Sequence, residues 1–81
     1  ARAMWQVYPN PTADILRVQP HRMVDALWVE DMRGRRVTGS IRASSTERVE
    51  LDLSNLAPGT YRLIGLAQGQ RFSTAVYKIQ P

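Results

Sequence analysis

The chain has 81 residues, of which 43% are hydrophobic and 22% charged, a composition typical of one small globular domain. It lacks cysteine and has one histidine, His21, which excludes disulfides, thiol nucleophiles and zinc–thiolate sites. Eleven basic and seven acidic residues give a formal charge of +4, but only Arg33, Arg35 and Arg36 cluster, without interleaved aromatic residues, so nucleic-acid binding is not predicted.

The hydropathy and the start of the chain carry two further expectations. No apolar run approaches the roughly 20 residues of a membrane-spanning helix, so we expect no direct membrane insertion. The chain begins with Ala1 and has no basic and apolar leader, so we expect it to be a piece of a longer precursor.

Apolar and polar residues alternate with a period of two through most of the chain, which predicts strands and no helix longer than a turn. The clearest run places Val49, Leu51 and Leu53 on one face, with Glu50 and Asp52 between them. Strands are expected near residues 4–8, 13–19, 24–31, 35–42, 47–53, 60–67 and 70–79. Their number and spacing predict an all-β fold, a seven-stranded immunoglobulin-like antiparallel β-sandwich.

Turn-forming residues separate these segments in chain order. Residues 9–11, Pro-Asn-Pro, end the first strand because proline fixes φ and removes a ladder donor. Gly34 suits the positive φ of a hairpin corner, where the preceding Asp31 can accept hydrogen bonds from turn amides. Leu56 lies as an apolar plug in the polar crossover 54–59, and residues 68–70 form the last hairpin.

The sequence predicts no catalytic, metal or cofactor site. No serine lies in a strained glycine-flanked elbow, and the single histidine stands in a loop. Glu50 and Asp52, beside Arg48, are expected to form the solvent-facing side of a half-buried strand. Asp31 and Asp52 do not belong to a spaced calcium loop. We therefore expect the domain not to be an enzyme.

Four motifs in order resemble one family over nearly the whole chain, from about Trp5 to Ile79. They are Val7 to Thr12, Leu16 to Val18, Val29 to Val37, and Leu51 to Leu63. Together they resemble the C-terminal sorting domain of cargo proteins of the type IX secretion system, the type A class (Por secretion system family). The resemblance implies that residues 1–4 end a linker from an upstream cargo and that residues 5–81 form the sorting domain.

The resemblance also implies a function, partners and a route. Such a domain directs its cargo across the outer membrane, from the periplasm to the cell surface or the exterior. Its expected partners are translocon or shuttle subunits, the N-terminal cargo domain of the same precursor, and a sortase-like cysteine transpeptidase that removes the domain. The cut is expected near or before Ala1. No cofactor is implied.

Recognition and motif residues follow from the same resemblance. The opening motif contributes residues that stop the first strand. The hairpin motif contributes a turn with an exposed guanidinium, and the crossover motif contributes an apolar residue that fills the end of the sandwich. The final strands are implied to carry much of the translocation signal. The residues are Tyr8, Pro9, Asn10, Pro11, Asp31, Gly34, Arg35, Leu53, Leu56, Gly59, Tyr61, Arg71, Lys78 and Ile79. Whether Arg71 or Lys78 serves recognition is left open.

Two hypotheses and two alternatives complete the sequence-based expectations. Residues 70–79 are expected to form an exposed edge strand that docks with the secretion machinery. The cluster Arg33, Arg35 and Arg36 is expected to attract an acidic partner surface. One alternative function is a fibronectin-like or carbohydrate-binding accessory module that uses Trp5, Trp28 and Tyr77. The other alternative is a structural spacer between catalytic domains.

Overall fold

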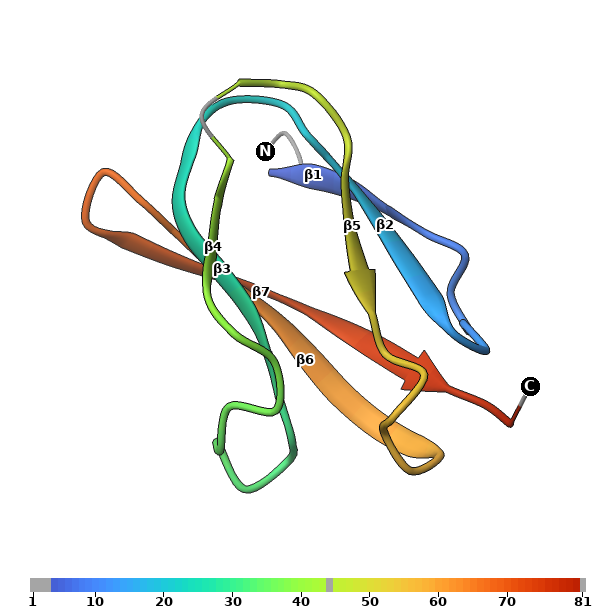
Figure 1. The fold of residues 1–81 in the computed structure, drawn as a ribbon. Helices are drawn as coiled ribbons and strands as arrows, with labels where there is room; N and C mark the ends of the chain where they lie inside the picture. The colour runs from blue at the N-terminus through green and yellow to red at the C-terminus, as the bar shows by residue number, and fades with distance from the viewer. Residues whose placement is uncertain (1–3, 44, 81) are drawn as a thin grey trace.

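The computed structural model describes residues 4–43 and 45–80 (Figure 1). Of the expected linker, residues 1–4, only Met4 falls within these ranges. None of the elements described is a helix that could cross a membrane. The strands are β1 (Trp5–Tyr8), β2 (Ile15–Pro20), β3 (Val24–Glu30), β4 (Ile41–Ala43), β5 (Val49–Asp52), β6 (Gly59–Ala67) and β7 (Gln70–Lys78).

The strands form two antiparallel sheets that share one core. The first sheet has the order β1-β2-β5 and the second the order β4-β3-β6-β7. The chain crosses between the sheets after β2, after β4 and after β5, as Figure 1 shows. β7 therefore lies at one edge of the larger sheet, next to β6 along its whole length, with pairs from Gly59 and Lys78 to Ala67 and Gln70.

Period-two alternation places the apolar residues inside. In β2, Leu16 and Val18 are fully buried, while Ile15 and Arg17, which alternate with them, are only half-buried. Both sheets contribute to the core, which consists of Trp5, Leu16, Val18, Val24, Leu27, Val29, Ala43, Leu51, Leu53, Tyr61, Leu63 and Val76. An apolar core of this kind supplies most of the stability of a small domain without disulfides.

Positive φ angles occur at the two hairpin corners where the sequence predicted tight turns. Gly34 has φ of 82° in the connection after β3. Gln68 and Gly69 have φ of 52° and 75°, the type I′ geometry that matches the twist of a two-residue hairpin. The predicted β6–β7 hairpin is therefore confirmed.

The prediction of a fourth strand over residues 35–42 is wrong for most of that range. β4 covers only Ile41–Ala43, and a single bridge between Glu30 and Arg36 precedes it. The Thr38 hydroxyl accepts the Val29 N–H at 2.9 Å, so a side chain replaces the carbonyl that would continue the ladder. The other six expected strands each overlap an observed strand.

Candidate functional site

The opening motif is joined directly to the last strand by the side chain of Asn10. Its Nδ2 donates to the carbonyl oxygen of Ala75 at 2.9 Å, and its Oδ1 accepts the Tyr77 N–H at 3.0 Å. The amide thus imitates a peptide group of a neighbouring strand. We call this pair of bonds the Asn10 clamp. It holds Ala75 and Tyr77, which lie 65 and 67 positions after Asn10 in the sequence.

Thr12 extends the clamp by backbone bonds. Its N–H donates to the Tyr77 carbonyl at 2.8 Å, and its own carbonyl accepts the Ile79 N–H at 2.9 Å. Thr12 also forms a parallel bridge with Lys78 and is almost completely buried. The edge of β7 is therefore covered from Ala75 to Ile79. The expectation of a free edge over residues 70–79 is wrong for this second half.

Replacement of Asn10 by alanine is expected to open the second half of β7. The loss of two exposed hydrogen bonds lowers the free energy of unfolding by about 1–2 kcal/mol. Amide hydrogen exchange of Tyr77 and Ile79, followed by NMR, should accelerate by about tenfold. Asn10→Asp keeps the acceptor and loses the donor, so its exchange rates should lie between those of the wild-type chain and of the Asn10→Ala variant.

The matched control is Asn55→Ala, since Asn55 is also an exposed asparagine but makes none of the hydrogen bonds found in the described residues. This variant should leave the exchange of Tyr77 unchanged. Equal exchange rates in the Asn10→Ala variant and the wild-type chain contradict the clamp.

The hairpin motif forms a corner organised by Asp31. Its carboxylate accepts the N–H groups of Arg33 at 2.9 Å and of Arg35 at 3.0 Å, as the sequence predicted for turn amides. The Arg35 guanidinium donates to the second oxygen at 3.3 Å, and Gly34 N–H donates to the Asp31 carbonyl at 3.0 Å. The corner is thus fixed by residues of the motif alone.

The same bonds shift the pKa of Asp31. The backbone amide of Arg35, followed by that of Arg33 and the Arg35 guanidinium, holds the pKa of this carboxyl below its ordinary value. Because the folded-state pKa is the lower one, the contribution of the corner is fully present above the ordinary carboxyl pKa. It is lost as the pH falls through the lowered value.

The crossover motif packs the end of the core between β5 and β6. Leu53 is fully buried, and its N–H donates to the Asp14 carbonyl at 2.7 Å, while Leu56 is half-buried against the core. The Tyr61 hydroxyl donates to the Ala57 carbonyl at 2.6 Å. This bond closes the crossover onto the start of β6, where Gly59 begins the strand.

The two basic candidates of the last strand differ in accessibility. Lys78 is only 3% exposed, and its ammonium group donates to the Ile79 carbonyl at 2.9 Å. The side chain of Arg71 is 59% exposed, although one guanidinium nitrogen lies 3.3 Å from a carboxylate oxygen of Glu30. Of the two residues, Arg71 is therefore exposed at the surface and Lys78 is buried. Ile79 is also exposed.

The expected basic cluster is divided among different contacts. Arg35 pairs with Asp31, and the Arg36 guanidinium carbon lies 3.9 Å from the ring centre of Trp28. Arg33 remains exposed. Tyr8, from the opening motif, is 38% exposed, and its interaction with Arg48 raises the pKa of that guanidinium.

Neither tryptophan is available as a platform for sugar stacking. Trp5 is 5% exposed inside the core, and its indole N–H donates to the Thr74 hydroxyl at 2.7 Å. Trp28 is 3% exposed under Arg36, and its indole N–H donates to Glu30 at 2.9 Å. Of the three aromatic contacts expected for a carbohydrate-binding module, only Tyr77 is exposed. No observation therefore favours that alternative.

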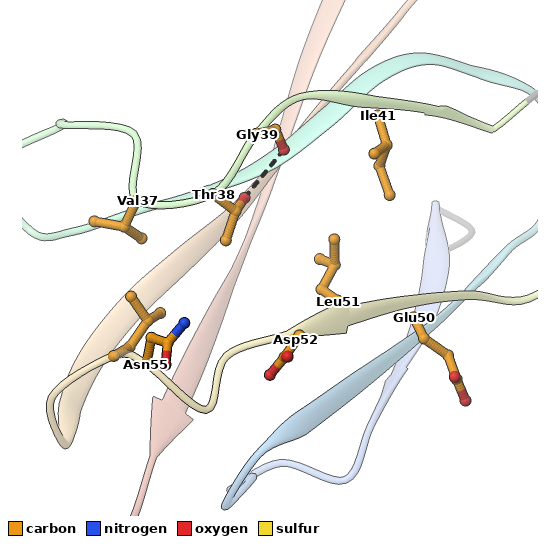
Figure 2. A pocket seen from close by; sticks show the side chains of 9 residues that line it. Val37, Thr38, Gly39, Ile41, Glu50, Leu51, Asp52 and Asn55 are labelled. Atoms are coloured by element: carbon orange, nitrogen blue, oxygen red, sulfur yellow. Dashed lines mark hydrogen bonds between the residues drawn. The ribbon is translucent and has the colours of Figure 1, made fainter.

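One groove opens beside the core, between β5 and the segment that leads into β4 (Figure 2). It has a volume of about 330 Å³. Ile41 and Leu51 point toward each other across it, and the carboxylate of Glu50 turns away. That carboxylate lies between Arg17, at 3.2 Å, and Arg48, at 4.0 Å, on the solvent-facing side of β5 as predicted. Of the candidate recognition residues selected from the sequence, only Leu56 lines the groove.

The motif residues do not converge on one reactive centre. They hold the end of β7, the corner after β3 and the crossover before β6, three separate parts of the fold. Within residues 4–43 and 45–80, no group of three or more histidine, aspartate or glutamate side chains is arranged to hold a metal ion. The contacts of the motif residues therefore fix three parts of the surface.

Sequence reasoning missed the Asn10 clamp and the close approach of Trp5 to Gly65. An isolated glycine within a strand pattern is a known sign that another group lies close to the backbone, so Gly65 could have been singled out. Nothing in the sequence indicates the partner of Asn10, because the bonds join opposite ends of the chain.

Comparison with known proteins gives one match. A family model with the description "Secretion system C-terminal sorting domain" matches residues 6–79. No curated protein and no solved structure shows a significant match. The matched range runs from β1 to the residue after β7 and includes all four sequence motifs.

Proposed function

Because the chain belongs to the family of secretion system C-terminal sorting domains, we propose that it is a non-catalytic address that takes an attached cargo protein through the type IX translocon. The observation that carries this proposal is the family match over residues 6–79. The contacts of the motif residues support it, since they fix three parts of the surface that a partner would contact.

An immunoglobulin-like sandwich is the finer fold that we infer for this address. The sheet orders β1-β2-β5 and β4-β3-β6-β7 correspond to strands A, B and E facing a sheet that contains C, F and G. The bond from Tyr61 near the start of β6 to the Ala57 carbonyl supports the inference, because a tyrosine corner occurs at this place in such folds.

The route and the partners are part of the proposal. The domain accompanies its cargo into the periplasm and is bound there by translocon or shuttle subunits through its outer surface. The cargo then reaches the cell surface or the exterior, and a sortase-like cysteine transpeptidase removes the domain near or before Ala1. The exposed Arg71, Tyr77 and Ile79 lie on the last strand or directly after it and are accessible to such a partner.

A reporter fusion tests the proposed function. Residues 1–81 are placed at the C-terminus of a periplasmic reporter enzyme in a cell with a functional type IX system. We expect most of the reporter activity at the cell surface, measured with intact cells, or in the culture medium. The same fusion in a strain without the translocon should stay in the periplasm. Equal surface activity in the two strains contradicts the proposal.

A further inference from the structure

The first half of the β7 edge has backbone groups without partners. In the β6–β7 ladder, the N–H and C=O groups of alternate β7 residues point away from β6, and Tyr77 shows which residues these are, since both of its groups bind residues 10 and 12. The outward groups of Arg71 and Ser73 make no hydrogen bond with any residue that the structure describes. An uncovered edge of this kind is a template for another strand.

Positive charge borders this half of the edge. Arg71 projects from the edge itself, and Arg62 of β6 stands directly opposite Ala75, whose methyl group leaves the space above it open. On the other face, the Arg22 guanidinium lies 5.5 Å from the ring centre of Phe72. All three arginines therefore lie along residues 70–75.

The nearby acidic groups offset only part of this charge, that of Arg71, whose guanidinium lies 3.3 Å from the Glu30 carboxylate. Glu30 is only 7% exposed and is engaged by Trp28 and Arg71, and no ion pair joins it to Arg62 across the sheet. Asp25 lies at the hairpin tip, where its carboxylate accepts the Gln68 N–H. The strand β7 itself contains no acidic residue. Charge complementarity therefore calls for an acidic partner.

We propose that residues 70–74 of β7 pair with an extended, acidic segment of a partner protein, which adds a strand to the β4-β3-β6-β7 sheet. The proposal rests on the proposed function, because the partner belongs to the secretion machinery. Main-chain bonds to Arg71 and Ser73 give affinity, and carboxylates on the outer face of the added strand meet Arg71 and Arg62. Since Arg71 and Ala75 lie about 13 Å apart along the strand, the two carboxylates should be about four residues apart.

A second copy of this chain is a poor occupant of the same edge. Antiparallel pairing about Ser73 would bring Arg71 of one copy beside Ala75 and Arg62 of the other. Like charges opposed across a strand pair are destabilising. The carboxylates of an acidic strand would instead attract Arg71 and Arg62.

Two variants in the reporter fusion test the pairing. Ser73→Pro removes an outward N–H that the domain does not use, and it should lower surface display by at least about tenfold. Arg62→Gln removes one positive charge and should lower display by about threefold. The matched control Arg42→Gln removes an exposed charge from β4, at the opposite edge of the same sheet, and should display like the unmodified fusion.

The possible outcomes separate the inference from the function on which it rests. Failure of the unmodified fusion to reach the surface contradicts the proposed function. Export of that fusion together with normal export of both Ser73→Pro and Arg62→Gln overturns only the strand pairing. Thermal unfolding of each purified variant shows whether it is folded, and if Ser73→Pro is not, the comparison of Arg62→Gln with Arg42→Gln decides. A dimer in sedimentation that Ser73→Pro abolishes would assign the edge to a second copy and overturn the acidic partner.

Discussion

Gly65→Ala is expected to lower the free energy of unfolding by about 3 kcal/mol, the upper range for overpacking a close-packed core. A β-carbon at Gly65 would lie 2.4 Å from Cζ3 and 2.7 Å from Cη2 of Trp5, far inside contact distance. The indole ring is rigid and 5% exposed, so it has no open space into which to move. Its displacement would also break the bond to Thr74 that ties β1 to β7.

Chemical and thermal unfolding measure this effect. For a domain of this size, a loss of about 3 kcal/mol lowers the melting temperature by about 15 °C. Gly39→Ala is the matched control, because a β-carbon at Gly39 would have no heavy atom within 4 Å and the residue has no positive φ. The control should change stability by less than about 0.5 kcal/mol. Equal melting temperatures for the Gly65→Ala and Gly39→Ala variants would show that the ring is not held against β6.

The alternation of apolar residues predicted burial well and strand pairing less well. Val49 and Leu51 face inward and Glu50 faces solvent, as the pattern of β5 indicated. Val37 and Ile41 are also partly buried against the core, yet no continuous strand joins them. The Thr38 hydroxyl takes the bond that a carbonyl would make, so the pattern reported which side chains face the core and not which backbone groups pair.

Contacts between residues close in the sequence could be predicted, but contacts between distant residues could not. Asp31 acts on amides two and four residues away, a local turn that composition and spacing predict. Asn10 acts on Ala75 and Tyr77, and a residue pattern carries no information on which distant strand will lie beside a proline-bounded loop. The half-covered edge of β7 was out of reach of sequence reasoning for the same reason.

Deletion of residues 72–81 is expected to abolish export while the cargo still folds. The deletion removes Val76, which is fully buried, together with Thr74, the hydrogen-bond partner of Trp5. It also removes both strand residues that the Asn10 clamp holds and leaves β6 without its neighbour. The remaining chain cannot keep the outer surface that the secretion machinery is proposed to bind.

The measurement compares cargo activity in cell lysates with cargo activity at the surface of intact cells. Deletion of Gln80 and Pro81 alone is the matched control, since these residues follow β7 and Ile79, and it should leave export unchanged. Full activity in the lysate with at most about 1% of normal surface activity is expected for the longer deletion, because a small domain unfolds cooperatively and its surface is then lost as a whole. Normal surface activity after that deletion would mean that export needs neither the final strand nor the contacts of the motif residues with it.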